Sequence, residues 1–158
     1  MGHYNFHKDL KDSKKAEHEY YTYLWSLANT QDVVFNNDNK HDLLRTLTNS
    51  PIELTYEVKD DKYSKRSGNA AFETRCRGKP SGITVTQAHW WVHKCYDSED
   101  GSSFFLKFNT EQLKEYVLDN GLLKVGGDKG SNTHMYLVKV SDLCNNLAPD
   151  VVYTSELY

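Results

Sequence analysis

The amino-acid sequence predicts an α/β fold in which a mixed β-sheet is flanked by helices. Residues 52–59 alternate between apolar and polar types, the period of two that is typical of a strand with one buried face. Residues 13–28 and 110–120 instead repeat apolar side chains at helical spacing. Helix-like and strand-like segments follow one another along all 158 residues, a length that suits a single domain.

The predicted helices have recognisable boundaries. Ser13 can cap the first helix, and Asn109 or Thr110 can cap the helix at 110–120, which ends before Gly121. Shorter helices are predicted at 84–89 and after Ser141, which can act as an N-cap. These four segments supply helices for both sides of the sheet.

The remaining apolar segments predict β-strands. Residues 60–68 are polar and charged and predict a loop, and the Gly-rich residues 125–132 predict a loose connection. The predicted strands are 31–35, 41–47, 52–59, 69–77, 90–96, 103–108 and 133–140.

Composition indicates a folded protein without a membrane helix. Apolar residues make up 38% of the chain, and eleven tyrosines add large, half-polar rings. There is no run of 18 or more apolar residues. Cys76, Cys95 and Cys144 are far apart, which predicts reduced thiols in a cytoplasmic protein, and the lack of CxxC or HxxxH pairs argues against structural zinc.

Basic residues are concentrated between Lys59 and Lys79. This segment has seven Lys or Arg and three Asp or Glu, so it carries +4, while the whole chain carries −3 and the rest therefore −7. One basic patch on an acidic body suits a local phosphate contact, although a solvated basic loop would have the same composition. The candidate nucleic-acid contacts are Lys62, Lys65, Arg66, Asn69, Arg75, Lys79 and Ser81.

An acid and a base stand side by side on the strand 52–59. Its period of two places Glu57 and Lys59 on one face, about 7 Å apart. Asp42, fifteen residues before Glu57, lies on the neighbouring strand, so the two carboxylates can share a divalent ion. Phosphodiester hydrolysis needs such a metal site and a nearby cation. The alternative to a catalytic role is that Glu57 and Lys59 form only a surface ion pair.

A further acid can complete the metal site. Glu17 shares the apolar stripe of the first helix, an unusual place for an unpaired acid, and lies either in the metal cleft or at the rim of the stripe. Glu19 is the second choice on that helix. Glu73 on the strand 69–77 either faces the cleft or pairs with Arg75.

Asp42 followed by Glu57-Val58-Lys59 resembles the motif of the PD-(D/E)XK nuclease superfamily. His41 replaces the proline that names the motif. The resemblance covers about residues 9–95. The wider sequence that is similar to small phage-type members comprises Tyr56 to Lys59, Gly68-Asn69, Phe72-Glu73 and Gly78 to Ile83.

This resemblance implies a restriction-endonuclease-like core with a central mixed sheet flanked by helices. It divides a single domain, 1–158, into a motif-bearing core at about 9–95 and a C-terminal strand-helix-strand extension at about 96–158. It implies an Mg²⁺-dependent (or Mn²⁺-dependent) deoxyribonuclease, with endonuclease action favoured and exonuclease action left open. Asp42, Glu57 and Glu17 would hold the metal, with Lys59 as a further catalytic residue.

DNA is the partner that the resemblance implies, in the host cytoplasm if the protein is phage-encoded. It allows a homodimer and implies neither a membrane nor a small-molecule cofactor. The superfamily includes inactive members, so the alternative is a nuclease-fold protein that binds nucleic acid or a protein partner without cutting.

Overall fold

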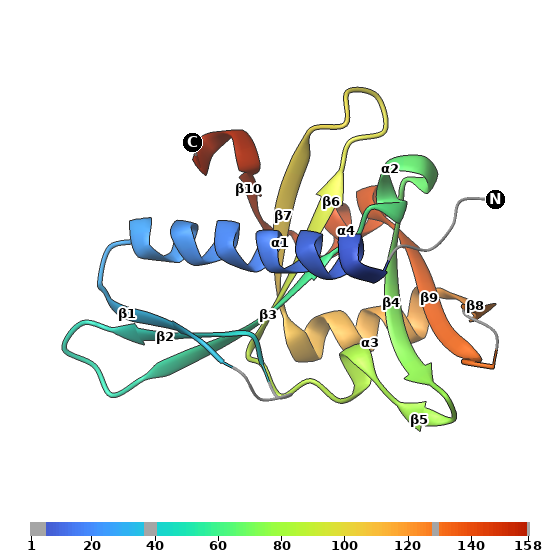
Figure 1. Ribbon diagram of the computed structural model, residues 1–158, viewed down its shortest axis with the longest axis horizontal. Coiled ribbons are helices and arrows are strands. Elements are labelled where there is room, and N and C mark those ends of the chain that lie inside the picture. The colour runs from blue at the N-terminus through green and yellow to red at the C-terminus, as the bar shows by residue number, and fades with distance from the viewer. Residues whose placement is uncertain (1–5, 37–40, 128–129, 158) are drawn as a thin grey trace.

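The computed structural model describes residues 6–36, 41–127 and 130–157. Within these ranges the chain forms two β-sheets with helices packed against them (Figure 1). The predicted α/β class, a mixed sheet flanked by helices, is confirmed. No helix in the described part is long and apolar enough to cross a membrane.

The larger sheet is mixed. Its strands among the described residues are β1 (Thr30–Phe35), β2 (Leu43–Leu47), β3 (Glu53–Asp60), β6 (Trp90–Tyr96), β7 (Ser103–Asn109) and β10 (Asp150–Tyr153). They lie in the order β1-β2-β3-β6-β7-β10. Neighbours are antiparallel except for β3 and β6, which run parallel at the centre of the sheet.

A smaller antiparallel sheet is built from two distant parts of the chain. Its strands are β4 (Asn69–Cys76), β5 (Lys79–Pro80), β8 (Leu122–Gly126) and β9 (Thr133–Lys139), in the order β5-β4-β9-β8. Strands β4 and β5 belong to the connection between β3 and β6, whereas β8 and β9 follow β7. The C-terminal residues 96–158 therefore contribute strands to both sheets.

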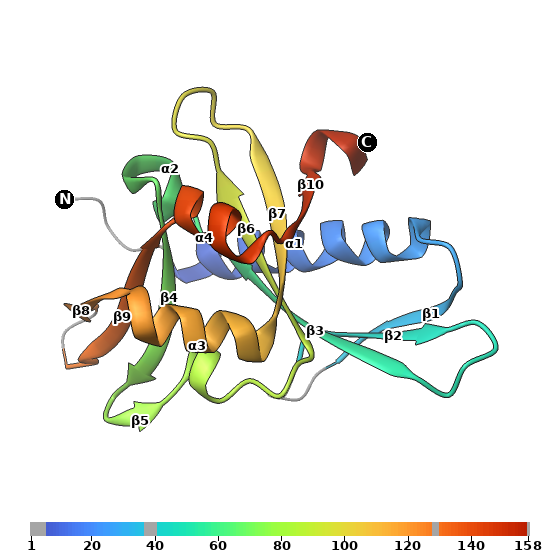
Figure 2. The ribbon, with the colours of Figure 1, turned by 180° about the vertical axis from the view of Figure 1, so that it is seen from behind.

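Helices cover both faces of the larger sheet. The helices are α1 (Phe6–Ser26), α2 (Tyr63–Ser67), α3 (Thr110–Asn120) and α4 (Val140–Leu147). Figures 1 and 2, which view the protein from opposite sides, show α1 on one face and α3 and α4 on the other. As predicted, Asn109 caps α3, because its side chain accepts the N–H of Gln112 at 3.1 Å.

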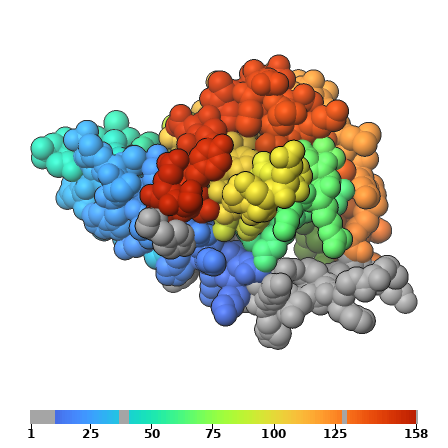
Figure 3. All heavy atoms as spheres, turned by 90° about the horizontal axis from the view of Figure 1, so that it is seen from above, coloured from blue at the N-terminus to red at the C-terminus, as the bar shows by residue number. Residues whose placement is uncertain are grey.

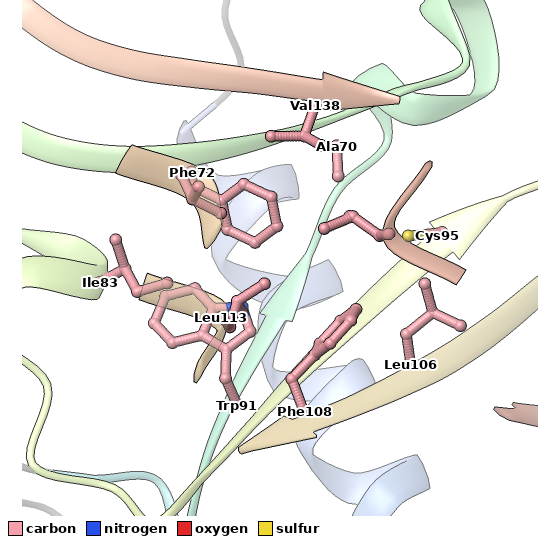
Figure 4. Packing of buried hydrophobic residues seen from close by; sticks show 11 residues of the cluster. Ala70, Phe72, Ile83, Trp91, Cys95, Leu106, Phe108, Leu113 and Val138 are labelled. Atoms are coloured by element: carbon pink, nitrogen blue, oxygen red, sulfur yellow. The ribbon is translucent and has the colours of Figure 1, made fainter. Parts of the chain in front are cut away.

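Alternating side chains of β6 and β7 form a hydrophobic core on each face of the sheet. Val92 and Phe105 pack beneath α1, whereas Trp91 and Leu106 pack towards α3, α4 and the smaller sheet (Figure 4). The core beneath α1 also contains Ala16, Tyr20, Leu24, Val33, Leu43, Tyr56, Val58 and Val152. Because residues on β3 alternate in the same way, this arrangement fixes the direction of Glu57 and Lys59.

The C-terminal end of the described chain closes over the sheet next to α1. A 3₁₀ turn at Thr154–Leu157 follows β10, and the Thr154 hydroxyl donates to the carbonyl of Ser103 on β7 at 3.1 Å. In Figure 3 this turn (red) lies between α1 (blue) and the β6–β7 hairpin (yellow).

The predicted helix at 84–89 is wrong. The chain forms a 3₁₀ turn at Gly82–Thr84 and then irregular backbone. The Thr84 hydroxyl donates to the carbonyl oxygens of Thr74 and Ser81 at 2.8 and 2.7 Å. Such side-chain bonds to backbone groups compete with helix formation.

The predicted cap at Ser141 is also wrong, since Lys139 occupies the N-cap position and α4 begins at Val140. The sequence does not predict α2, β8 or β10 either. The five residues of β8 are all exposed, so the strand is set by its pairing with β9 rather than by a buried face. In α2, the carboxylate of Asp61 accepts the N–H of Ser64 at 3.3 Å, which supports a single helical turn.

Candidate active site

The β2–β3 pairing brings Asp42 beside the segment Glu57-Val58-Lys59. Asp42 immediately precedes β2, and the register pairs the next residue, Leu43, with Tyr56. The Asp42 N–H donates to the Tyr56 carbonyl at 2.9 Å, and Asp42 Oδ2 accepts the N–H of Val58 at 2.8 Å. The predicted antiparallel neighbourhood of Asp42 and the motif strand is confirmed.

Glu57 and Lys59 point away from α1. Tyr56 and Val58 are buried in the core beneath α1, so their alternating neighbours face the side of the smaller sheet. Lys59 Nζ lies 3.0 Å from Glu57 Oε1 and 5.9 Å from the centre of the Trp91 ring. The side chain of Glu57 is 14% exposed and that of Lys59 is 44% exposed, so the ammonium is within reach of a ligand.

Glu17 on α1 is electrostatically coupled to this group. Burial contributes most to raising the pKa of Glu17, and the negative charges of Asp42 and Glu57 raise it further, from 4.5 to about 7. Lys59 opposes the increase. These charge effects indicate that Glu17 lies within electrostatic reach of Asp42 and Glu57. Glu17, Asp42 and Glu57 do not themselves line the cleft that opens beside Lys59, so whether Glu17 lies in a metal cleft or at the rim of the stripe stays a prediction.

The other three groups carry perturbed pKa values as well. Burial raises the pKa of Asp42, against the Val58 N–H and Lys59, which both lower it. Burial also raises the pKa of Glu57, against the charge of Lys59. For Lys59 itself burial disfavours the charged form, but Glu57 and then Asp42 outweigh it and raise the pKa of the ammonium. The charges of Glu57 and Asp42 therefore keep the ammonium of Lys59 charged.

A divalent cation fits the chemistry of these donors. Carboxylate oxygens are preferred ligands of Mg²⁺ and Mn²⁺, and a cation among them would relieve the repulsion that raises the pKa of Glu17. Among the described residues, no three Asp, Glu, His or Cys side chains are already gathered to hold a metal ion. Glu17, Asp42 and Glu57 would therefore have to turn towards a shared ion when one binds.

A cleft of about 660 Å³ opens beside Lys59, between the two sheets. Trp91 from β6 lines it on one side, and Glu73 from β4 and Met135 from β9 line it on the other. The negative charge of Glu73 contributes to the raised pKa of Lys59, so the two side chains are within electrostatic reach. Lys124 on β8 adds a further cation, which the sequence could not place because β8 joins the cleft only through its pairing with β9.

A buried polar network lies at the cleft and was missed by sequence reasoning. His93 Nε2 lies 2.8 Å from Asp61 Oδ2, and the Trp91 indole N–H donates to His93 Nδ1 at 3.1 Å. With Nδ1 accepting, His93 is neutral and its Nε2–H donates to Asp61. Asp61 also accepts the N–H of Ala71 on β4, so one carboxylate ties the two sheets together.

Replacing Asp61 with Ala is expected to destabilise the protein by about 3 kcal/mol, because His93 and two backbone N–H groups would lose their buried acceptor. Although burial opposes ionisation, these hydrogen bonds lower the pKa of Asp61. Their contribution is present at neutral pH and is lost as pH falls through that lowered pKa. Urea unfolding of the native protein and of Asp61→Ala measures the difference in the free energy of unfolding. The matched change Asp150→Ala removes the 70%-exposed partner of Lys107 and should cost under about 1 kcal/mol. Equal costs for both would contradict the prediction.

Glu19, the second choice for the metal site, forms a buried ion pair with Lys94. Its Oε1 lies 2.7 Å from Lys94 Nζ, and each of the two side chains is only 7% exposed. Lys94 also lies over the rings of Tyr96 and Phe105. Glu19 therefore neutralises a buried lysine beneath α1, which leaves Glu17 as the carboxylate that α1 brings to Asp42 and Glu57.

The candidate phosphate contacts fall into separate groups. Lys65 and Arg66 are exposed on α2, whereas Arg75 and Lys79 are exposed at the opposite end of β4 and on β5 (Figure 1). Lys62 lines the cleft and is paired with Asp12. Asn69 begins β4, and Ser81 precedes the 3₁₀ turn with its hydroxyl oxygen buried and without a partner among the described residues. Ser81 is therefore not positioned to contact a phosphate from solvent.

Glu17→Gln is expected to stabilise the metal-free protein above pH 7. A raised carboxyl pKa means that stability is highest below the usual 4.5 and is lost as pH rises to about 7, where the buried charge forms beside Asp42 and Glu57. The neutral amide avoids this loss. Because the site is partly solvated, we expect a gain of about 1 kcal/mol at pH 8 and almost none at pH 4. Thermal unfolding in chelator at both pH values measures it, and a gain that does not change with pH would contradict it.

No protein-family model, curated protein or solved structure matches the chain. The function must therefore be argued from the side chains of the candidate site.

Proposed function

We propose that this protein is a nuclease that uses Mg²⁺ or Mn²⁺ to hydrolyse phosphodiester bonds of DNA. The observation that carries the proposal is the geometry around β3: Asp42 accepts the N–H of Val58 at 2.8 Å, and Lys59 Nζ lies 3.0 Å from Glu57 Oε1, with Glu17 of α1 within electrostatic reach. Asp42 lies just before β2 and is brought to β3 by strand pairing, so this meeting is a product of the fold and not of sequence proximity. It is also the meeting that the motif resemblance implies.

We infer further that α1 with β1, β2, β3 and β6 forms a restriction-endonuclease-like core. The support is that this unit positions each motif residue. Strands β2 and β3 are antiparallel neighbours, which sets Asp42 beside Glu57. The parallel strand β6 supports β3 from the other side and pairs Lys59 with His93, next to the cleft.

Each residue of the site has a distinct part in this proposal. Glu17, Asp42 and Glu57 would hold the divalent ion, which supplies Lewis-acid activation of the phosphate when bound. Lys59 is positioned by its 3.0 Å contact with Glu57 and is kept charged by its acidic neighbours. Its ammonium can orient the attacking water or donate to a phosphate oxygen as negative charge develops there.

The basic side chains around the cleft would position the nucleic acid without reading its sequence. Lys62 and Lys124 line the cleft itself, and Lys65 and Arg66 lie on α2 next to Lys62. Ammonium and guanidinium groups of this kind contact phosphates and fix the register of the substrate. The preference for DNA over RNA and for internal cleavage rests on the motif resemblance.

The test is incubation of the full chain with single-stranded, duplex, branched and nicked DNA and with RNA. We expect DNA cleavage with Mg²⁺ or Mn²⁺, loss of cleavage with chelator, and loss of cleavage in Asp42→Asn with the metal present. Binding without cleavage by the native protein would instead support a nuclease-fold protein that has lost its chemistry. If the protein neither binds nor cleaves any of these substrates, the proposal is wrong.

A further inference from the structure

Exposed and half-buried aromatic rings on α1 and β1 form a continuous row. The rings of Tyr21 and Phe35 are stacked, with centroids 4.6 Å apart and an angle of 18° between their planes. His18 lies 4.6 Å from Phe35 on one side, and Trp25 lies 6.4 Å from Tyr21 on the other. We call His18, Tyr21, Trp25 and Phe35 the aromatic row.

Most of the aromatic row lies outside the hydrophobic core, although Tyr21 is half-buried and packs against the core beneath α1. The core face of α1 is formed by Ala16, Tyr20 and Leu24, all at most 1% exposed. In contrast, Trp25 is 43% exposed and Phe35 is 38% exposed. Phe35 ends β1, which is at the edge of the larger sheet among the described strands, and its ring packs on that of Tyr21. Exposed apolar surface that is gathered in this way usually marks a binding site.

The row begins at the candidate active site. Glu17 and Tyr21 are separated by four residues and therefore share one face of α1, and Trp25 lies one turn further on. On β1, Phe35 pairs with Leu43, the residue after Asp42, and the N–H of Asn36 donates to the carbonyl of Asp42 at 2.9 Å. Each element thus places an aromatic residue close to a proposed metal-binding residue: Tyr21 one turn from Glu17 on α1, and Phe35 beside the residue that follows Asp42.

We propose that the aromatic row binds unpaired bases of the substrate by stacking, so that the protein acts on nucleic acid with a single-stranded segment beside the bond to be cut. This inference rests on the proposed nuclease function. Bases in a duplex hide their flat faces, whereas unpaired bases expose them to aromatic side chains. Lys14, which is exposed four residues before His18, adds a cation at the end nearest to Glu17.

The length of the row suits a short stretch of single strand. Trp25 lies seven positions after His18, which corresponds to ~10 Å along a helix that rises 1.5 Å per residue. Stacked nucleotides in one strand are about 3.4 Å apart, so the row spans roughly three of them. The bases would be held beside the scissile phosphate, and sequence preference is not expected because every base offers a stacking face.

The experiment measures binding of a short oligothymidylate to the full chain in chelator, where cleavage cannot occur. The native protein should bind it with quenching of tryptophan fluorescence, and Trp25→Ala and Phe35→Ala should each weaken binding about tenfold or more. Tyr153→Ala is the matched control, because Tyr153 is 47% exposed on β10 at the other edge of the same sheet. Its affinity should equal that of the native protein. Each variant is first checked for a native unfolding temperature.

The inference is overturned if the native protein does not bind oligothymidylate, or if Trp25→Ala and Phe35→Ala bind it as tightly as the native protein does. It is also overturned if these variants change their oligomeric state and that change accounts for their weaker binding. The last result would assign the row to a contact between protein copies. Because the assay contains no metal and measures no cleavage, its outcome is separate from that of the proposed function. If the native protein cleaves DNA but the row variants bind oligothymidylate as tightly as it does, the proposed nuclease function stands and the proposed role of the aromatic row is wrong.

Discussion

Replacing Lys59 with Ala is expected to lower the rate of phosphodiester cleavage by about 10²-fold or more while the fold is retained. Lys59 is 44% exposed, so its loss leaves no cavity in either core. Its ammonium lies 3.0 Å from Glu57 Oε1, and no ligand function is assigned to it. Metal affinity should therefore be largely kept, and kcat should fall much more than KM changes. Rapid-quench measurement of single-turnover cleavage, with calorimetry of Mn²⁺ binding, separates the two quantities.

Two further variants decide between catalysis and a plain ion pair. Lys59→Arg should restore only part of the rate, because a guanidinium is a planar fork and cannot occupy the place of a compact ammonium. Lys107→Ala removes a comparable ion pair, in which Lys107 Nζ lies 3.0 Å from Asp150. This pair is on β7 and β10, away from the candidate site on β3. Lys107→Ala should leave the rate unchanged. If Lys59→Ala cleaves at the native rate, Lys59 has only the small structural role of a surface pair.

The strands that carry the site could be predicted because their residues obey a local rule. Residues 52–59 alternate strictly, and the structure places β3 at Glu53–Asp60. The alternation also predicted that Glu57 and Lys59 share a face, which their 3.0 Å contact confirms. The third helix was predicted at its observed bounds, since Asn109 and Gly121 mark both of its ends. In these segments local preference and tertiary packing agree.

The surroundings of the site could not be predicted because they depend on contacts between distant segments. Glu17 and Glu19 both lie on the first helix near its apolar stripe. Only the structure shows that Glu19 forms an ion pair with Lys94 on β6. The cleft depends on the pairing of β4 with β9, whose residues are about sixty positions apart. Likewise, Asp61 lies in a segment with the composition of a solvated loop, yet it is 8% exposed and bonded to His93. No local pattern contains this information.

Asp42→Asn is expected to show opposite effects on the metal-free and the metal-bound protein. The amide oxygen of Asn can still accept the Val58 N–H that Asp42 accepts at 2.8 Å, so the β2–β3 junction should be kept. Removing one of three neighbouring carboxylates relieves the repulsion that raises the pKa of Glu17. In chelator the variant should therefore unfold at the same temperature as the native protein or at a slightly higher one.

With Mg²⁺ or Mn²⁺ the order should reverse. The native protein gains stability from a ligand that binds only the folded state, whereas Asp42→Asn should gain little at the same concentration. Replacing even an outer partner of a metal site costs about 10–100-fold in affinity, so loss of a direct ligand should cost at least about 100-fold, and cleavage should fall with it. Asp150→Asn, an exposed acid on the same sheet, is the control and should respond to the metal like the native protein. If Asp42→Asn and the native protein show the same thermal shift with Mn²⁺ and the same calorimetric affinity, then Asp42 does not hold a metal. The carboxylates of Glu17, Asp42 and Glu57 would in that case be a charge cluster without the proposed chemistry.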